Sequence, residues 1–185
     1  MKKILMLVVV AMMATLSASA QDMYIKPMVG ANLTKFVGDV SNQKFKVGLV
    51  AGAEFGYDVN ERFGLTAGLL YAMQGSKTKG ADNNTNVDYL NIPVLANVYI
   101  VPGLAIKAGP QLGIRTRAKY DDIDLKDNFK AIDFSIPVGL SYEISGFVID
   151  ARYNIGVTNI AKDSYGGGKA RNSVIQLTLG YKIPF

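Results

Sequence analysis

Apolar and polar side chains alternate with period two along most of the chain. The clearest run covers 63–74. One face of this run carries Phe63, Leu65, Ala67, Leu69, Tyr71 and Met73. Such alternation places two sets of side chains on opposite faces of a β-strand, and it does not fit a helix. The same pattern predicts eight strands, over residues 24–34, 44–57, 63–74, 89–100, 104–116, 132–144, 147–158 and 173–185.

The connections between these strands alternate in length. Those at 58–62, 101–103 and 144–146 are short, whereas those at 35–43, 75–88, 117–131 and 159–172 are long and polar. An antiparallel meander gives this alternation when its short turns share one end and its long loops the other. We therefore expect an all-β, eight-stranded, antiparallel up-and-down barrel.

Two closed barrels with opposite burial fit this pattern. A soluble barrel of the lipocalin type keeps its apolar face inside, whereas a transmembrane barrel turns that face to lipid. Here the apolar face is bulky, and the other face is rich in glycine. These glycines are Gly48, Gly52, Gly56, Gly64, Gly68, Gly109, Gly113, Gly139, Gly156 and Gly180. An eight-stranded interior is narrow, so this distribution of sizes favours a transmembrane barrel.

Aromatic residues concentrate near both predicted ends of the strands. Near the short turns they are Tyr57, Phe63, Tyr99, Tyr142, Phe147, Tyr181 and Phe185, of which Tyr99 has the inward parity. Toward the long loops they are Phe45, Tyr71, Tyr89 and Phe134. Paired aromatic girdles are expected where a barrel meets the lipid headgroups.

The first twenty residues have the features of a secretory signal peptide. Lys2 and Lys3 precede an apolar run over 4–16, and Ala18-Ser19-Ala20 supplies a cleavage site of small residues. A membrane anchor fits less well because the apolar run is too short to span a bilayer as a helix. We expect residues 1–20 to be the signal and 21–185 to form the barrel domain.

Composition narrows the possible chemistry. The 185 residues include no Cys and no His, which excludes disulfides, thiol nucleophiles, histidine-based triads and histidine metal sites. The net charge of +5 falls to +3 without Lys2 and Lys3, and its even spread argues against nucleic-acid binding. The acidic run 121–127 lacks the glycine and closing glutamate of a calcium loop. We expect no catalytic residue, no cofactor and no metal site.

The C-terminus carries a specific motif. Thr178 and Gly180, followed by Ile183 and the terminal Phe185, resemble the signal by which outer-membrane barrels are recognised for assembly. An assembly machine can bind such a segment as an edge strand, through its backbone and alternate side chains. We therefore expect the barrel-assembly machinery to be a partner during biogenesis.

Four further stretches resemble the PorT-like outer-membrane β-barrel proteins of Bacteroidota. They are 89–93 (YLNIP), 108–113 (AGPQLG), Asp133-Phe134 with Gly139, and 150–156 (DARYNIG). With the two termini, the resemblance covers essentially the whole mature chain. It implies a small outer-membrane barrel in the size class of OmpA-type and OmpX-type barrels. The name-giving member of that family is linked to protein secretion, and the family pattern has no catalytic residues.

Prolines and charges break the strand pattern. Proline removes a donor from the ladder, so we expect bulges or unpaired sites near Pro93 and Pro110, and Pro27 and Pro137 have no such explanation. Charged residues of inward parity form the candidate site: Lys26, Glu54, Lys107, Glu143, Asp150, Arg152 and Lys182. Buried charges must be paired, so a structural network of ion pairs across the lumen is expected, with an acid–base or ion relay at Glu54, Glu143 and Asp150 as the functional alternative.

These observations predict a small non-catalytic outer-membrane barrel with a structural or interaction role, accessory to protein secretion or to envelope organisation. The alternative is a narrow pore or a ligand-binding barrel for a small solute or lipid, and a filled eight-stranded lumen disfavours the pore. Expected partners are outer-membrane lipid and lipopolysaccharide, and an envelope or secretion protein, but no nucleic acid. We expect the long loops outside the cell and both termini in the periplasm.

Overall fold

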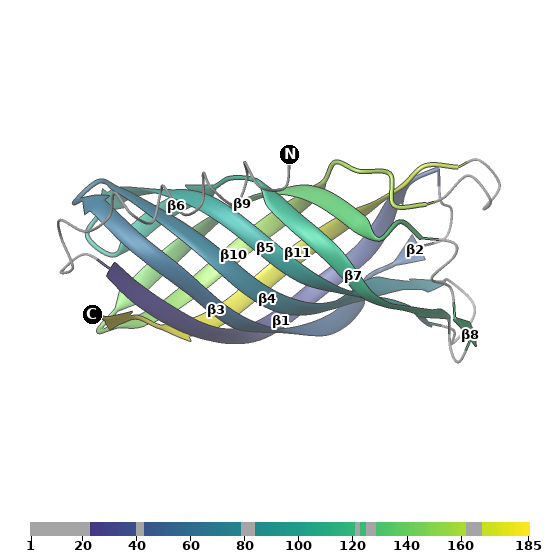
Figure 1. Cartoon of the computed structure of the whole chain (residues 1–185), viewed down its shortest axis with the longest axis horizontal. Coiled ribbons are helices and arrows are strands. Elements are labelled where there is room, and N and C mark those ends of the chain that lie inside the picture. Colours follow the sequence, from purple (N-terminus) through teal and green to yellow (C-terminus); the bar gives the residue numbers. More distant parts are fainter. Residues whose placement is uncertain (1–22, 40–42, 79–83, 121–122, 125–128, 162–167) are drawn as a thin grey trace, which may run out of the picture.

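The computed structural model describes residues 23–39, 43–78, 84–120, 123–124, 129–161 and 168–185. Within these ranges, twelve strands form a single sheet that closes into a barrel with steeply tilted strands (Figure 1). The strands are β1 (Met23–Gly38), β2 (Gln43–Lys44), β3 (Lys46–Asn60), β4 (Phe63–Thr78), β5 (Asn84–Val101), β6 (Leu104–Ala108), β7 (Gln111–Tyr120), β8 (Ile123–Asp124), β9 (Ile132–Ile144), β10 (Phe147–Gly156), β11 (Ala170–Tyr181) and β12 (Ile183–Pro184). The predicted signal peptide lies outside the described residues.

The twelve strands occupy eight antiparallel positions in a closed ring, because some positions hold two consecutive strands, such as β6 with β7 and β11 with β12. β1 pairs with β3 on one side and with β11 and β12 on the other. The ring continues from β3 through β4 and β5 to β6 and β7, and then through β9 and β10 back to β11. The predicted eight-stranded antiparallel meander is therefore confirmed.

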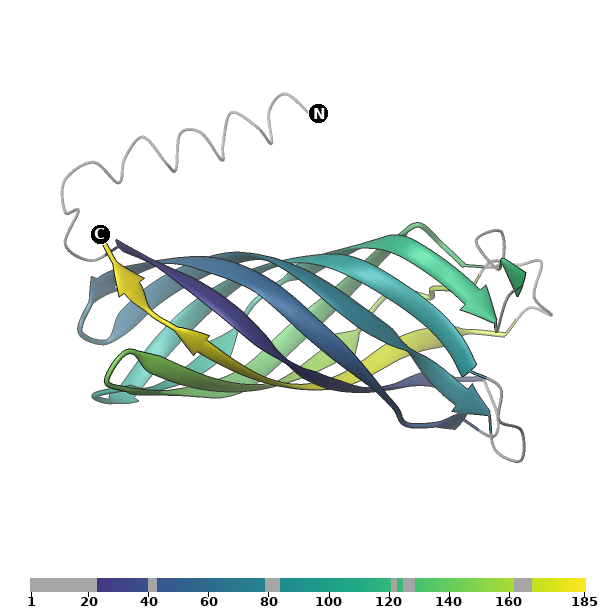
Figure 2. The same cartoon turned by 90° about the horizontal axis from the view of Figure 1, so that it is seen from below.

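The two ends of the barrel differ in their connections. One end, called here the turn end, carries the short turns after Asn60, Val101 and Ile144, as well as the C-terminus (Figure 2). At the last of these turns Ser145 and Gly146 have φ of 51° and 84°, the two positive values that a tight hairpin turn requires. The opposite end, called the loop end, carries the long connections. There the strands extend beyond the predicted limits, since β1 reaches residue 38 and β4 residue 78.

The prolines gather at breaks in the ladder. β6 ends at Ala108 and β7 begins at Gln111, so Pro110 lies in the gap between them. The pairing of β4 with β5 also stops opposite Pro93, and Pro137 of β9 faces the same gap from the other side. Pro27 faces the break between β11 and β12. The irregularities expected near Pro93 and Pro110 are confirmed. Pro27 and Pro137 also lie opposite breaks in the ladder, so they too are accommodated where a backbone donor is not needed.

The outward face of the barrel is apolar. Exposed side chains of this face include Val47, Leu49, Leu69, Leu140 and Leu177, each more than half exposed. A continuous apolar surface of this extent is stable in a lipid environment and unfavourable in water. None of the described residues forms a helix long and apolar enough to cross a membrane.

The aromatic residues follow the predicted girdles with one correction. Phe63, Tyr142, Phe147, Tyr181 and Phe185 are exposed near the turn end, and Phe45, Tyr71 and Phe134 are exposed nearer the loop end. Tyr89 does not belong to the outer girdle. It is only 1% exposed because it shares the inward parity of Asn91 and Asn97. Its ring therefore fills the lumen.

Candidate functional site

Five charged side chains meet inside the barrel, in the half nearer the turn end. This ion cluster comprises Lys26 of β1, Glu54 of β3, Lys107 of β6, and Asp150 and Arg152 of β10, each at most 3% exposed. Lys26 Nζ lies 2.8 Å from Glu54 Oε2, and these two residues are paired across β1 and β3. Because β6 and β10 lie on the other side of the ring from β3, the side chains bridge the lumen.

Lys107 and Arg152 hold the ion cluster together. Lys107 Nζ lies 2.7 Å from Asp150 Oδ2 and 3.2 Å from Glu54 Oε2. The Arg152 guanidinium donates to both oxygens of Asp150 and also contacts Glu54. Each carboxylate therefore faces several cations. Buried charges with such partners are stable as a set, whereas loss of one member leaves an unpaired charge in a low dielectric.

A second charged group lies below the ion cluster, at the turn end. Lys182 Nζ lies 2.8 Å from Asp58 Oδ2 and 3.4 Å from Glu143 Oε2, and these side chains are 20–32% exposed. The Tyr99 hydroxyl donates to Asp58 at 2.8 Å, and the Lys182 ammonium lies 4.3 Å from the centre of the Tyr24 ring. We call Asp58, Glu143 and Lys182 the turn-end triad.

A small cavity lies between the ion cluster and the turn-end triad. Its volume is about 20 Å³, and Lys26, Lys107, Lys182 and Glu143 contribute to its polar wall. A space of this size accommodates about one water molecule. The turn end of the lumen is therefore closed by side chains to any larger solute.

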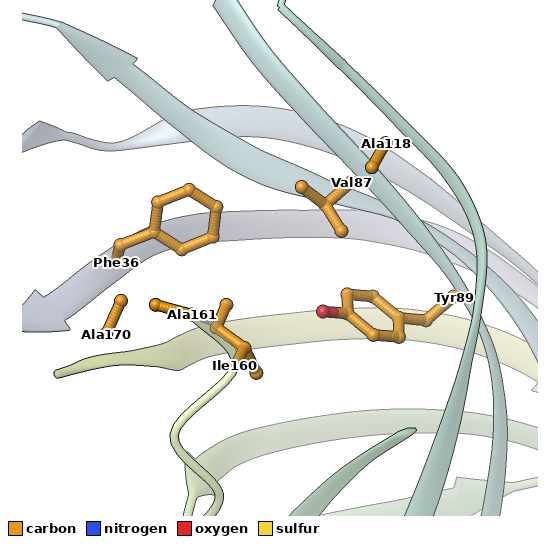
Figure 3. Close-up of a cluster of buried hydrophobic side chains, with 7 residues drawn as sticks. All are labelled: Phe36, Val87, Tyr89, Ala118, Ile160, Ala161 and Ala170. Carbon is orange, nitrogen blue, oxygen red and sulfur yellow. The ribbon is translucent and has the colours of Figure 1, made fainter. Parts of the chain in front are cut away.

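Apolar side chains close the loop end of the lumen. This apolar plug consists of Phe36, Val87, Tyr89, Ala118, Ile160, Ala161 and Ala170, whose side chains point toward one another inside the ribbon (Figure 3). Phe129 packs against it, with its ring centre 5.8 Å from that of Phe36. The plug thus joins residues of β1, β5, β7 and β11 to residues of two connecting segments.

Two connecting segments fold across the lumen mouth to complete the plug. The amide of Ile160 donates to the carbonyl of Ala170, and the amide of Lys130 donates to the carbonyl of Ile160, both at 2.8 Å. A bridge between Phe129 and Ala161 links the segments. We call residues 157–161 the strap, because this segment carries Ile160 over the opening.

Buried polar side chains lie between the ion cluster and the apolar plug, and we call Asn32, Asn154 and Gln176 the polar layer. Asn32, Asn154 and Gln176 are at most 2% exposed, and the Asn154 amide donates to Gln176 at 3.4 Å. Both polar atoms of Asn32, the Asn154 oxygen and the Gln176 nitrogen have no partner among the described protein atoms. Buried polar groups without a protein partner are hydrogen-bonded to water or to a small polar solute. The polar layer therefore has hydrogen-bonding capacity that the described protein atoms do not use.

The whole barrel matches a known domain family. The model of the outer membrane protein beta-barrel domain covers residues 4–182. The chain belongs to this outer-membrane β-barrel family. Among curated proteins, none matches the sequence significantly.

Solved structures of outer-membrane barrels share the fold of this family member. Ail of Yersinia pestis, solved in complex with the heparin analogue sucrose octasulfate, is 16% identical, with 88% of this chain and 99% of that chain covered and a TM-score of 0.55. Neisserial surface protein A (NspA) is 14% identical, with 88% and 97% covered and a TM-score of 0.55. At these identities the similarity shows a common fold.

The structure places all seven predicted charges of this outer-membrane barrel in the half of the lumen nearer the turn end, but in two groups. Lys26, Glu54, Lys107, Asp150 and Arg152 form the ion cluster, and Glu143 and Lys182 belong to the turn-end triad. Asp58 was not predicted, because the expected strand ends at residue 57 and β3 continues to residue 60. With Asp58 included, the two groups hold four cations and four carboxylates.

The apolar plug was also missed. The sequence predicts polar loops over 117–131 and 159–172, although Phe129 in one and Ile160 with Ala161 in the other are apolar. Phe36 and Val87 of the plug also fall in connections predicted to be polar, so isolated apolar residues in these loops were the available signal. The run 121–127 lies mostly outside the described residues.

The residues of the predicted assembly signal lie on both faces of β11 and the C-terminal segment that follows it. Thr178 and Gly180 are buried on the inward face, whereas Ile183 and Phe185 are 42% and 65% exposed on the outward face. Ile183 is paired with Ile25 of β1, and the ring of Phe185 stacks on Phe55 with centres 6.3 Å apart. The final segment thus closes the ring against β1.

Proposed function

We propose that this outer-membrane barrel is a non-catalytic protein with a structural or interaction role, accessory to protein secretion or to envelope organisation. One observation carries the proposal: among the described residues, the ion cluster fills the lumen toward the turn end and the apolar plug fills it toward the loop end. A barrel closed at both ends offers its loops, its turns and its outer wall as working surfaces, and binding commonly resides in loops on a rigid scaffold. The resemblance to PorT-like proteins supports the secretion role.

The proposal includes an orientation in the membrane. The long loops face the cell exterior, and both termini lie in the periplasm. The arrangement of the chain supports this orientation, since the Phe185 amide donates to the carbonyl of Met23 and so places both ends of the barrel at the turn end. The outward apolar band contacts outer-membrane lipid, including lipopolysaccharide, and the C-terminal motif serves the barrel-assembly machinery.

The pairing of the lumen charges supports a non-catalytic role. Both Glu54 and Asp150 are engaged by cations, and Glu143 is near Lys182. A general base needs a free carboxylate beside a space for substrate, and the adjacent cavity of about 20 Å³ is too small for one. An ion relay through Glu54, Glu143 and Asp150 would also need carboxylates that are free to bind the ion, and these three are engaged by cations.

Crosslinking in cells tests the interaction role. The chain has no Cys, so single cysteines at Lys130 or Lys169 at the loop end and at Arg62 at the turn end give unique attachment points. We expect one end to capture a specific envelope or secretion protein and the other to give no specific product. A strain lacking the protein should then lose secreted proteins or envelope integrity. Normal secretion and a normal envelope in that strain would contradict the proposal.

A narrow pore or a ligand-binding barrel is the second candidate, and the polar layer favours it. Unpartnered buried atoms of Asn32, Asn154 and Gln176 could bind a small polar solute once the strap moves. Single-channel recording in planar bilayers separates the candidates. The sealed barrel should show no conductance, whereas steady conductance of the unmodified protein would favour the pore.

A further inference from the structure

Basic side chains on the outside of the barrel concentrate at the loop end. Seven lysines and arginines are exposed among the described residues, and Arg62 alone is at the turn end. The other six are Lys44, Lys77, Arg117, Lys130, Lys169 and Arg171. Since the exposed charges of the two ends differ, the two surfaces present different electrostatic potentials to the membrane.

Two basic residues share one outward patch on β1 and β11. Lys35 of β1 is paired with Ser173 of β11, and Arg171 of β11 is paired with Val37 of β1. The two cations are therefore diagonal neighbours on adjacent strands, two residues apart in the register. The ammonium of Lys35 lies 4.7 Å from the centre of the Phe45 ring. The hydroxyl groups of Tyr153 and Ser173 lie 3.0 Å apart beside them. The patch therefore combines two cations with two hydroxyl groups.

This patch borders the apolar band on β1 and β11. On its side toward the turn end, the outward residues Leu33 of β1 and Ile175 of β11 are apolar and 41% and 45% exposed. Headgroups begin where the apolar surface of a barrel ends. Within the described part of the chain, neither Lys35 nor Arg171 has a carboxylate within ion-pair distance. The patch thus places two cations at headgroup depth that no described carboxylate pairs with.

We propose that Lys35 and Arg171 bind a phosphate monoester on the headgroup of an outer-leaflet glycolipid, the lipid A part of lipopolysaccharide. This inference rests on the proposed orientation, which places the loop end in the outer leaflet. Arginine binds phosphate oxygens through parallel N–H donors, and lysine adds a compact charge. The hydroxyl of Ser173 or Tyr153 can donate a further hydrogen bond. The acyl chains then lie against the apolar residues below.

Native mass spectrometry of the purified, folded protein in detergent tests this site with diphosphoryl lipid A as the probe. The double variant Lys35→Gln, Arg171→Gln should retain lipid A about tenfold more weakly, because both charge-assisted contacts are lost. The matched control Lys77→Gln, Arg117→Gln removes the same charge from the same end, on β4 and β7, neither of which pairs with β1 or β11. It should bind within about twofold of the unmodified protein. The heat-dependent gel shift of each variant establishes that the barrel is folded.

Several results would overturn the assignment. Equal losses in the two double variants would mean diffuse attraction to a charged rim. Equal retention of phosphatidylglycerol or of dephosphorylated lipid A would mean that no phosphate monoester is recognised. The orientation is tested separately, by labelling a single cysteine at Lys169 in intact cells with a membrane-impermeant reagent. Failure to label would refute the orientation, and the detergent experiment would still decide whether the phosphate site exists.

Discussion

Charged side chains fill the lumen at the turn end, whereas apolar side chains fill it at the loop end. At the turn end, the ion cluster consists of strand residues whose positions are fixed by register, and at the loop end the apolar plug depends on Phe129 and Ile160 from connecting segments. Charges on rigid strands are held by geometry, and every partner is needed. Apolar side chains on a strap need only be buried. The first closure is therefore expected to be permanent and the second to open locally.

The largest expected effect is on the ion cluster. Replacing Arg152 by Met leaves Asp150 and Glu54 with less positive charge in a buried setting, and we expect the free energy of unfolding to fall by about 3–5 kcal/mol. Urea unfolding of the protein in lipid vesicles, followed by the heat-dependent gel shift, measures this change. Lys130→Met, an exposed change at the loop end, is the control. Equal stability of the two variants would show that the cluster contributes no more than an exposed charge.

The ion cluster shows which features of the lumen could be predicted from the sequence. Parity placed Lys26, Glu54, Lys107 and Arg152 inside the barrel, because side chains of a strand alternate without exception until a bulge occurs. Parity cannot show which inward charges meet, since that depends on the tilt and stagger of the strands around the ring. The separation of Glu143 and Lys182 from the ion cluster was therefore beyond prediction.

The loop end resisted prediction for a different reason. Ile160 and Ala161 lie in a segment without alternation, and their burial results from contacts with residues far away in the sequence, such as Phe36. Period-two patterns report neighbours within a strand and carry no information on where a loop folds back. The fold was thus predictable from local pattern, the ionic closure in part, and the apolar closure only as isolated apolar residues in polar loops.

A second expected effect concerns the space that the ion cluster occupies. Gly139 of β9 lies beside Arg152, and a Cβ at this glycine would be 2.2 Å from the carbonyl oxygen of Ala151 and 3.0 Å from Arg152 Cγ. Gly139→Ala should lower the free energy of unfolding by about 3 kcal/mol, because backbone must shift to accept the methyl group. The same urea assay measures it.

The control for this glycine is Gly168, where an added Cβ would be 3.5 Å from the nearest neighbour, the Cβ of Asp39. Gly168→Ala should change stability by less than about 1 kcal/mol. If Gly139→Ala were as stable as this control, close packing would not be what positions Arg152.

An intermediate effect is expected at the apolar plug. Ile160→Ala removes most of a fully buried side chain, which costs about 2 kcal/mol at the low end of such substitutions because the strap can move. The loss should appear as faster hydrogen exchange of the Ile160 amide, which is bonded to Ala170, while barrel unfolding in urea changes little. A comparable loss in global stability would mean that the strap unfolds only with the barrel, and the contrast between the two closures would fail.

The smallest effect is expected at the turn-end triad, although its members carry the same charges as the ion cluster. Lys182→Gln breaks contacts to Asp58 and Glu143, whose side chains are 21% and 32% exposed. Water replaces the lost partner, so the free energy of unfolding should fall by less than about 1 kcal/mol, and by still less in high salt. Lys107→Gln, with the same change of residue inside the ion cluster, is the matched comparison in the urea assay. A loss at Lys182 as large as at Lys107 would show that connection to the buried charges, rather than burial itself, determines how much each charge contributes.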